Sequence, residues 1–168
     1  MFANPEPATP PTTPSSYAIQ NTLAGGTYTV GSGGAYATLT AAGAAYNTSC
    51  LGGPVTFSLI SATYPSETYP VTINGNADAS AINTLTIKPA VGVSPAFSGN
   101  NINGILRLNG ADYVTIDGSN AVAGTTRDLT ITNTNTGASA TVWLNSVNAG
   151  NGATNNTVKN CTIFGYSA

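Results

Sequence analysis

The sequence contains little charge and no histidine. Only ten of its 168 residues are charged at neutral pH, six acidic and four basic, which gives a net charge of −2. This is about a quarter of the charged fraction usual in a soluble domain. Nucleic-acid binding needs several Lys or Arg side chains on one face to neutralise phosphates, and the sequence has no basic cluster. Nucleic acid is therefore not expected as a partner.

Long apolar runs are also missing. No apolar segment approaches the length needed to cross a membrane, so we expect no membrane span. The start, Met1 to Pro5, lacks the basic residues and the apolar stretch of a signal peptide, so a secreted form would be a mature or trimmed one. The polar surface must instead come from Thr, Ser and Asn. Neutral surfaces of this kind are associated with long-lived extracellular proteins, and we expect an extracellular or cell-surface location.

Cysteine is scarce, with only Cys50 and Cys161, far apart in the sequence. Without histidine or a close cysteine pair, neither a metal site nor another cofactor is expected. Cys161 occupies an apolar strand position, where a thiol behaves as a small hydrophobic group. We therefore expect two buried thiols, with a single disulfide as the alternative.

Proline is concentrated at one end. Residues 1–16 contain five prolines between Pro5 and Pro14, which favours an extended tail or linker. The main domain is expected over residues 17–168, beginning with a short strand at Tyr17–Ile19. Alanine-rich residues 35–46 show helical spacing, and Thr38 is suited to cap that helix.

After Gly53 the pattern is that of short strands. Val55, Phe57 and Leu59 alternate with polar residues, and similar apolar pairs follow to the end of the chain, separated by Asn, Asp and Gly turns. Four phrases are nearly alike: Leu85-Thr86-Ile87, Val114-Thr115-Ile116, Leu129-Thr130-Ile131 and Cys161-Thr162-Ile163. Recurring strand-and-turn units are typical of a solenoid. An antiparallel sandwich also has short strands, but Asn-rich corners suit stacked coils, where amides hydrogen-bond from one coil to the next.

The segment from Gly31 to Leu39, with the alanine-rich helix after it, resembles the opening of pectinesterases and related right-handed parallel β-helices. Gly53-Pro54-Val55 and Thr63-Tyr64 with Glu67 continue the likeness. The resemblance implies an all-β, pectin-lyase-like solenoid with a short N-terminal capping helix.

The later segments strongly resemble the β-helix regions of large secreted proteins of Bacteroidota, which are type IX secretion substrates. The segments are 108–119, 127–131 and 155–163. In those proteins such a region usually precedes adhesion-type domains and a sorting tail, which is absent here. The resemblance implies a structural or adhesive surface protein.

Catalytic residues are not evident. Pectinesterases use two Asp with Gln and Arg on one strand face, whereas this chain has one Gln, Gln20, and Cys161-Thr162-Ile163-Phe164-Gly165 lacks the acid of the corresponding strand. Asp112 and Asp117 flank one strand without forming a pair. We therefore expect no enzyme activity. The alternative is the non-catalytic N-terminal part of a carbohydrate-active β-helix enzyme.

Two surface features suggest ligands. Outward-facing threonines suggest ice binding as a function; they are at positions 56, 72, 86, 115, 130, 132 and 162. Ice binding needs a flat and regular grid of threonines. We expect these threonines to fall on several faces with irregular spacing, which argues against that function. Trp143 alternates out of phase with Val142 and Leu144, so it is expected to face outward. It is the best single candidate for contact with a surface polysaccharide, the alternative being that it covers a neighbouring loop.

The sequence stops directly after a strand, without a capping element. An uncapped solenoid end exposes strand edges and apolar core to another chain. The expected partner is either the remainder of a longer chain or a second copy, added head-to-tail into a filament. The residues expected to take part are Tyr17, Ile19, Ile163, Phe164 and Tyr166.

Overall fold

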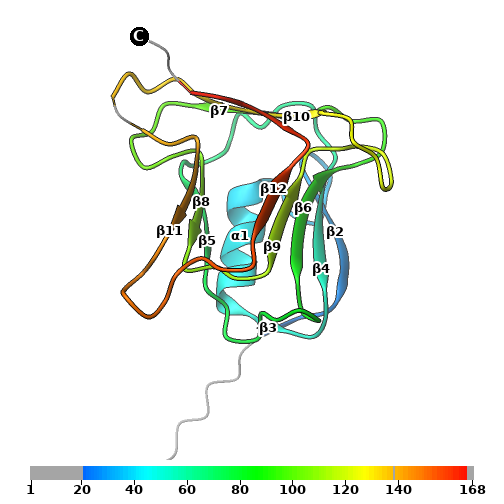
Figure 1. Cartoon of the computed structure of the whole chain (residues 1–168). Helices are drawn as coiled ribbons and strands as arrows, with labels where there is room; N and C mark the ends of the chain where they lie inside the picture. Colours follow the sequence, from blue (N-terminus) through cyan, green and yellow to red (C-terminus); the bar gives the residue numbers. More distant parts are fainter. Residues whose placement is uncertain (1–20, 138, 166–168) are drawn as a thin grey trace, which may run out of the picture.

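The computed structural model describes residues 21–137 and 139–165, which form a parallel β-solenoid of about four turns with one short helix (Figure 1). The fold class expected from the repeated phrases is confirmed. The elements are β1 (Thr22–Leu23), β2 (Gly26–Val30), α1 (Leu39–Thr48), β3 (Cys50–Leu51), β4 (Val55–Leu59), β5 (Val71–Asn74), β6 (Leu85–Pro89), β7 (Ala96–Gly99), β8 (Leu106–Asn109), β9 (Val114–Asp117), β10 (Leu129–Asn133), β11 (Val142–Asn145), β12 (Thr157–Lys159) and β13 (Cys161–Phe164).

Three stacked parallel sheets form the walls of the solenoid. One contains β2, β4, β6, β9 and β12 in spatial sequence, the second β5, β8 and β11, and the third β7, β10 and β13. In Figure 1 the first two sheets stand on opposite sides, the third runs across the top, and α1 is seen between them. Strands β1 and β3 make a short additional pair. Each strand thus pairs with the strand one coil away, as a solenoid requires.

Alternation along each strand places the core inside the coils. In β4 the buried residues Val55, Phe57 and Leu59 alternate with half-buried Thr56 and Ser58. Successive side chains of a strand point to opposite faces, so the apolar set of every coil faces inward and stacks on the set below. Full burial of one such side chain contributes roughly 1.5–3 kcal/mol, and this stacking is the main source of stability.

Asparagine amides connect successive coils at the end of the second sheet. Asn109 donates from Nδ2 to Oδ1 of Asn74 at 2.9 Å, and Asn145 donates in the same way to Asn109 at 2.8 Å. The three residues occupy equivalent register positions on β5, β8 and β11. The sequence-based prediction that Asn-rich corners hydrogen-bond between coils is confirmed here.

Helix α1 lies over the first coil and packs on β5. Thr38 caps it as predicted, because Ala41 N donates to Thr38 Oγ1 at 3.0 Å. Helical structure begins at Leu39 rather than at residue 35, since the glycine-containing segment before it forms a turn with positive φ at Gly31 and Gly33. It also continues to Thr48, two residues beyond the predicted end.

Both ends of α1 are held by loops from the next coil. The Glu67 carboxylate accepts hydrogen bonds from Leu39 N at 2.5 Å and Thr40 N at 2.8 Å, which satisfies donors that a helix start leaves unpaired. At the other end Asn76 donates from Nδ2 to the carbonyls of Tyr46 and Ser49, each at 2.9 Å. The helix is therefore fixed as a lid on the first coil.

Some expectations differ from the structure or lie outside it. The prediction did not include β1, β3 or β7, and the tail at residues 1–16 and the strand at Tyr17–Ile19 lie outside the described residues. Cys50 and Cys161 form no disulfide with each other, and each is half-buried rather than fully buried. For Cys161 the reason is its place on β13, which no described coil covers.

Within residues 21–137 and 139–165 no helix is long and apolar enough to cross a membrane.

Candidate functional site: the open end of the solenoid

The last described coil exposes side chains at positions that the coil below it buries. Leu144 on β11, Val158 on β12 and Ile163 on β13 are 44%, 37% and 43% exposed. Each continues an inward-facing column in register with a residue that is no more than 1% exposed on the coil below. The pairs are Leu144 with Leu108, Val158 with Ile116, and Ile163 with Ile131. Among the described residues, none forms a layer over these core positions.

The backbone of this coil is open as well. Strands β11, β12 and β13 are the edge strands at one end of the three sheets, and β5, β2 and β7 are those at the other end. Within the described residues β11, β12 and β13 each pair only with the strand beneath them. A free strand edge presents unpaired N–H and C=O groups to another chain. We use the name open end for β11, β12 and β13 together with their exposed side chains.

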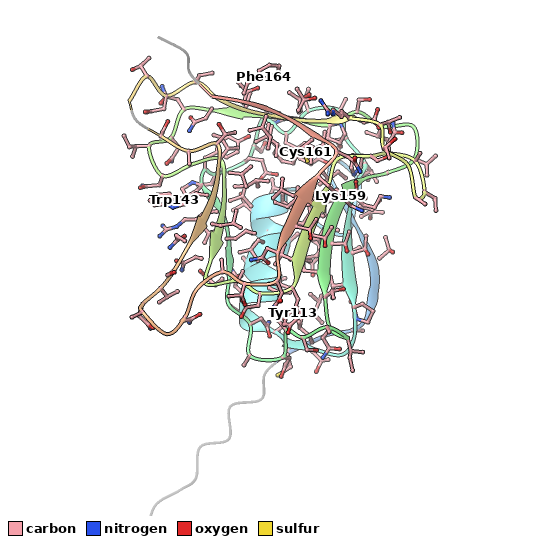
Figure 2. All side chains as sticks on the ribbon, viewed as in Figure 1. Tyr113, Trp143, Lys159, Cys161 and Phe164 are labelled. Carbon is pink, nitrogen blue, oxygen red and sulfur yellow. The ribbon has the colours of Figure 1, made fainter. Side chains whose placement is uncertain are left out.

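Two of the predicted assembly residues lie at the open end. Ile163 continues the inward-facing column of Ile131. Phe164 next to it, which is labelled in Figure 2, is 53% exposed. Phe164 also accepts a hydrogen bond through its carbonyl from Thr141 Oγ1 at 2.9 Å, which ties β13 to the start of β11. The other three, Tyr17, Ile19 and Tyr166, lie outside the described residues.

The Cys161 thiol at the open end is not suited to covalent chemistry. Burial raises its pKa to about 11, so the thiol stays protonated at neutral pH. Its Sγ donates to the carbonyl of Lys159 at 3.1 Å. Because the thiolate is the reactive form of cysteine, this side chain acts as part of the apolar surface rather than as a nucleophile.

Trp143 lies on the outer face of β11, as its phase in the strand predicts, and is 36% exposed. The guanidinium of Arg107, its register neighbour on β8, lies 5.1 Å from the ring centroid. Arg107 is held there by a hydrogen bond from Nε to Asn145 Oδ1 at 2.8 Å. The indole therefore has a cation over one face, a cation–π arrangement that fixes its orientation.

Threonines form one regular row on the five-stranded sheet. The row consists of Thr27, Thr56, Thr86, Thr115 and Thr157. The expectation of irregular placement was wrong for this sheet, because loop insertions between strands leave the register unchanged. The neighbouring outward positions, however, carry Thr29, Ser58, Lys88, Asp117 and Lys159. Charged side chains thus occupy three of these five neighbouring positions, so the sheet does not present a regular grid of hydroxyl groups.

The carboxylates within the described residues are dispersed and engaged in structural contacts. The contacts are Glu67 with the start of α1, Asp78 with Leu51 N, Asp112 with Thr154 N, Asp117 with Lys159 Nζ at 3.3 Å, and Asp128 with Asn120 N. In this part of the chain no group of three or more His, Cys, Asp or Glu residues is arranged to hold a metal. Asp117 also closes the predicted turn by accepting from Ser119 N at 3.2 Å.

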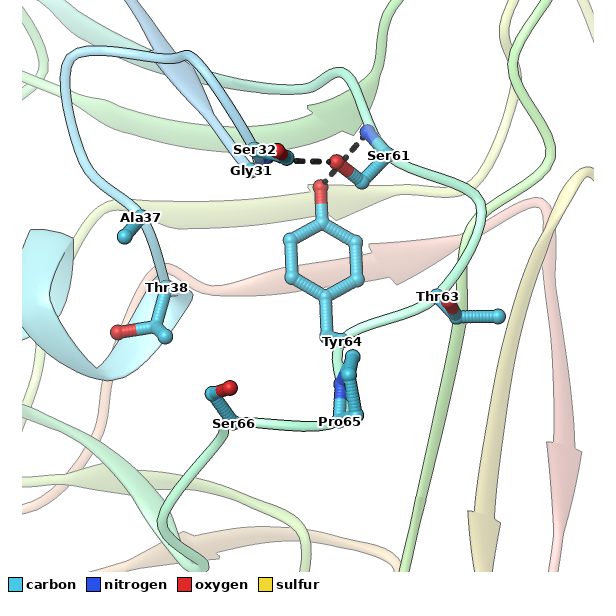
Figure 3. Close-up of a pocket in the computed structure, with 9 residues that line it drawn as sticks. All are labelled: Gly31, Ser32, Ala37, Thr38, Ser61, Thr63, Tyr64, Pro65 and Ser66. Carbon is cyan, nitrogen blue, oxygen red and sulfur yellow. Dashed lines mark hydrogen bonds between the residues drawn. The ribbon is translucent and has the colours of Figure 1, made fainter.

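A pocket of about 330 Å³ lies beside the first coil and is lined by hydroxyl groups (Figure 3). Ser61 Oγ accepts from Ser32 N at 2.9 Å, and the Tyr64 hydroxyl donates to the carbonyl of Val30 at 2.7 Å. Its described lining residues include no charged side chain at neutral pH. A hydroxyl without an adjacent base is a weak nucleophile, so this pocket does not form an active site of the Ser–His type.

Comparison with models of protein families, with curated proteins and with solved structures gave no match. The class of the protein therefore follows from its fold, and the chain is a parallel β-solenoid with a helix near its N-terminus.

Proposed function

We propose that this chain is a non-enzymatic, structural or adhesive module of the cell surface, and that its open end binds further protein. The observation that carries the proposal is the exposure of Leu144, Val158 and Ile163 at positions whose register partners on the coil below are buried. The resemblance to secreted β-helix proteins of Bacteroidota supports the location and the adhesive role. The dispersed carboxylates favour this function over catalysis.

Side-chain burial alone does not give stable binding at the open end. Covering the exposed part of three apolar side chains contributes on the order of 1 kcal/mol each, whereas association costs at least about 4 kcal/mol in lost freedom of movement. Hydrogen bonds from the edges of β11, β12 and β13 must supply the rest. We therefore expect modest affinity, with association becoming evident at roughly 0.1 mM chain.

Light scattering of the purified 168-residue chain tests the proposal. A concentration series with negative-stain images of the same samples is expected to show a mass that rises above that of one chain. A mass that stays at one chain at every concentration would overturn self-association. In that case the open end would serve only to continue the solenoid within a longer chain.

For the adhesive role, Trp143 is the proposed contact for surface polysaccharide, because the indole combines a partly exposed apolar ring with a fixed orientation. A neutral soluble glucan serves as the probe, with the emission of this residue as the readout. The chain has one tryptophan, so the signal reports on this position alone.

A further inference from the structure

Asparagine is followed directly by glycine at four places in the chain. The pairs are Asn74-Gly75, Asn103-Gly104, Asn109-Gly110 and Asn151-Gly152. In such a pair the backbone nitrogen of glycine can attack the side-chain carbonyl carbon of asparagine, because glycine has no Cβ to hinder the close approach. The attack requires that the asparagine amide and the glycine nitrogen can move toward each other. The fold places the four pairs in two different environments.

Two of the pairs belong to the row of asparagines that connects β5, β8 and β11. Asn74 Oδ1 accepts from Asn109 Nδ2 at 2.9 Å, and Asn109 Oδ1 accepts from Asn145 Nδ2 at 2.8 Å. The glycine nitrogens are held as well. Gly75 N donates to Asn109 O at 3.0 Å, and Gly110 N donates to Asn145 O at 2.9 Å. Attack in either pair would first require these hydrogen bonds between coils to open.

The pair Asn151-Gly152 lies in the loop between β11 and β12. The Asn151 side chain is exposed, and neither its amide nor the Gly152 nitrogen has a hydrogen-bond partner among the described residues. The loop folds back over earlier coils, since Asn151 lines a cavity of about 410 Å³ together with Gly75 and Asp112. Its main chain is fixed there, because Val147 N donates to Asn151 O at 2.8 Å.

The pair Asn103-Gly104 lies in the loop between β7 and β8. The Asn103 side chain is exposed, and its amide has no hydrogen-bond partner in the described part of the chain. Gly104 N donates to Asn101 O at 3.3 Å, a longer bond than those of the asparagine row. Since this bond lies within one turn of a single loop, it can open without separating two coils.

We propose that Asn103 and Asn151 are sites of spontaneous deamidation, and that the fold protects Asn74 and Asn109. The glycine nitrogen forms a bond to the asparagine Cγ, and the Cγ–Nδ2 bond breaks. Ammonia leaves and carries away the proton of the glycine nitrogen. Water then opens the resulting five-membered succinimide at either of its carbonyls, which gives aspartate or isoaspartate. Water is the only co-reactant.

The reaction adds charge to a surface that has little. An aspartate carboxyl has a usual pKa of about 3.9, so it is ionised at neutral pH. Conversion at both sites therefore doubles the net charge of −2. At Asn151 the new carboxylate lines the same cavity as Asp112. This inference goes beyond the proposed function and does not rest on it. A long-lived chain would become more acidic with age.

The test is incubation of the folded 168-residue chain at mildly alkaline pH for days to weeks. Proteolysis and mass spectrometry then measure conversion at each pair, because a converted peptide is heavier by the difference between a hydroxyl and an amino group. We expect at least about tenfold faster conversion at Asn103 and Asn151 than at Asn74 and Asn109. In parallel samples unfolded in urea, all four pairs are expected to convert at similar rates.

Gly152→Ala is the matched variant for one of the sites. A Cβ on Gly152 would meet Ser146 Oγ at 3.3 Å and Thr154 Cγ2 at 4.0 Å, and φ at Gly152 lies outside the positive region that strains other residues. The added methyl group crowds ring closure. Conversion at Asn151 is therefore expected to slow, and conversion at Asn103 is expected to stay unchanged as an internal control.

Two results would overturn the proposal. One is equal conversion of all four pairs in the folded chain, with circular dichroism showing that it remains folded. The other is a folded chain in which neither Asn103 nor Asn151 converts while the urea sample does. Neither result bears on the proposed function, which is tested separately by the mass of the chain in solution and by titration with glucan.

Discussion

The side-chain amide of Asn47 hydrogen-bonds the backbone of Thr72 at 3.0 Å in the position that a strand would occupy. The same amide accepts from Asn74 N at 2.8 Å, so one residue of α1 pairs a donor and an acceptor on the edge of β5. The helix therefore covers the apolar core of the first coil and also part of the strand edge beside it.

We predict that Asn47→Ala lowers the free energy of unfolding by about 2 kcal/mol, because it leaves two part-buried backbone groups without partners. The measurement is urea unfolding followed by circular dichroism. Asn103→Ala is the control, since the Asn103 side chain is exposed. Equal urea midpoints for the two variants would show that the hydrogen bonds of Asn47 do not stabilise the packing of α1 on the first coil.

Tyr46 gives a prediction at alkaline pH. Burial, with a smaller contribution from the nearby Asp112 charge, raises the pKa of its hydroxyl to about 12. A group that loses its proton less readily when folded stabilises the fold below the unfolded pKa and loses that contribution as pH rises. The free energy of unfolding is therefore expected to fall as pH rises from about 10 to about 12.

Tyr46→Phe is the matched variant for that experiment. The hydroxyl of Tyr46 is buried and has no hydrogen-bond partner in the described part of the chain. Its removal is expected to raise stability at neutral pH by about 1 kcal/mol and to reduce the alkaline loss. Destabilisation by the substitution would show that the hydroxyl is hydrogen-bonded in solution.

Asp117 gives a prediction at acid pH. Burial alone would raise the pKa of its carboxyl, but hydrogen bonds from Asn160, Ser119 N and Lys159, together with the Lys159 charge, lower it below the usual 3.8. A carboxyl with a lowered folded pKa stabilises the fold above the unfolded value and loses that contribution as pH falls through the folded value.

Urea midpoints should therefore fall less steeply for Asp117→Asn than for the wild-type chain between about pH 5 and about pH 2. The same pair compared at neutral pH gives the baseline difference in stability. Parallel pH profiles for the two chains would show that the Asp117 contacts do not contribute to acid sensitivity.

Trp143 provides a fluorescence prediction. Arg107→Ala removes the guanidinium 5.1 Å from the ring centroid and leaves the indole more exposed, so its emission is expected to shift to longer wavelength. Arg127→Ala is the control, because Arg127 is exposed in the loop before β10.

The emission of Trp143 also tests the proposed polysaccharide contact. Wild-type emission that does not change on titration with a neutral glucan would rule out that contact with this probe.

Much of the fold was predictable because the solenoid depends on local alternation. Val55, Phe57 and Leu59 can bury one face only as a strand, and the repeated Leu-Thr-Ile phrases mark equivalent positions on successive coils. Strand β7 was missed because Phe97 is its only buried apolar side chain, and Ala, Ser and Gly surround it. A strand with one buried apolar residue has no alternation to detect.

The candidate site was predictable in part. Ile163 and Phe164 were identified because they end the last strand phrase, but Leu144 and Val158 were not connected with them. These residues come together only because β11, β12 and β13 occupy the same coil. Asn47 also gave no separate signal, since an asparagine near the end of a helical segment looks like any polar surface residue.

The sequence by itself determined the class of the fold, the place of the helix and the neutral surface, because strand alternation, turn residues and charge are local properties. Only the tertiary structure decided which residues align between coils and which end remains open. Thr27 and Thr157 stand in one row because register, not sequence distance, sets the stacking of coils. The open end is likewise a property of the assembled coil, since exposure depends on what lies above a residue and not on its neighbours in the chain.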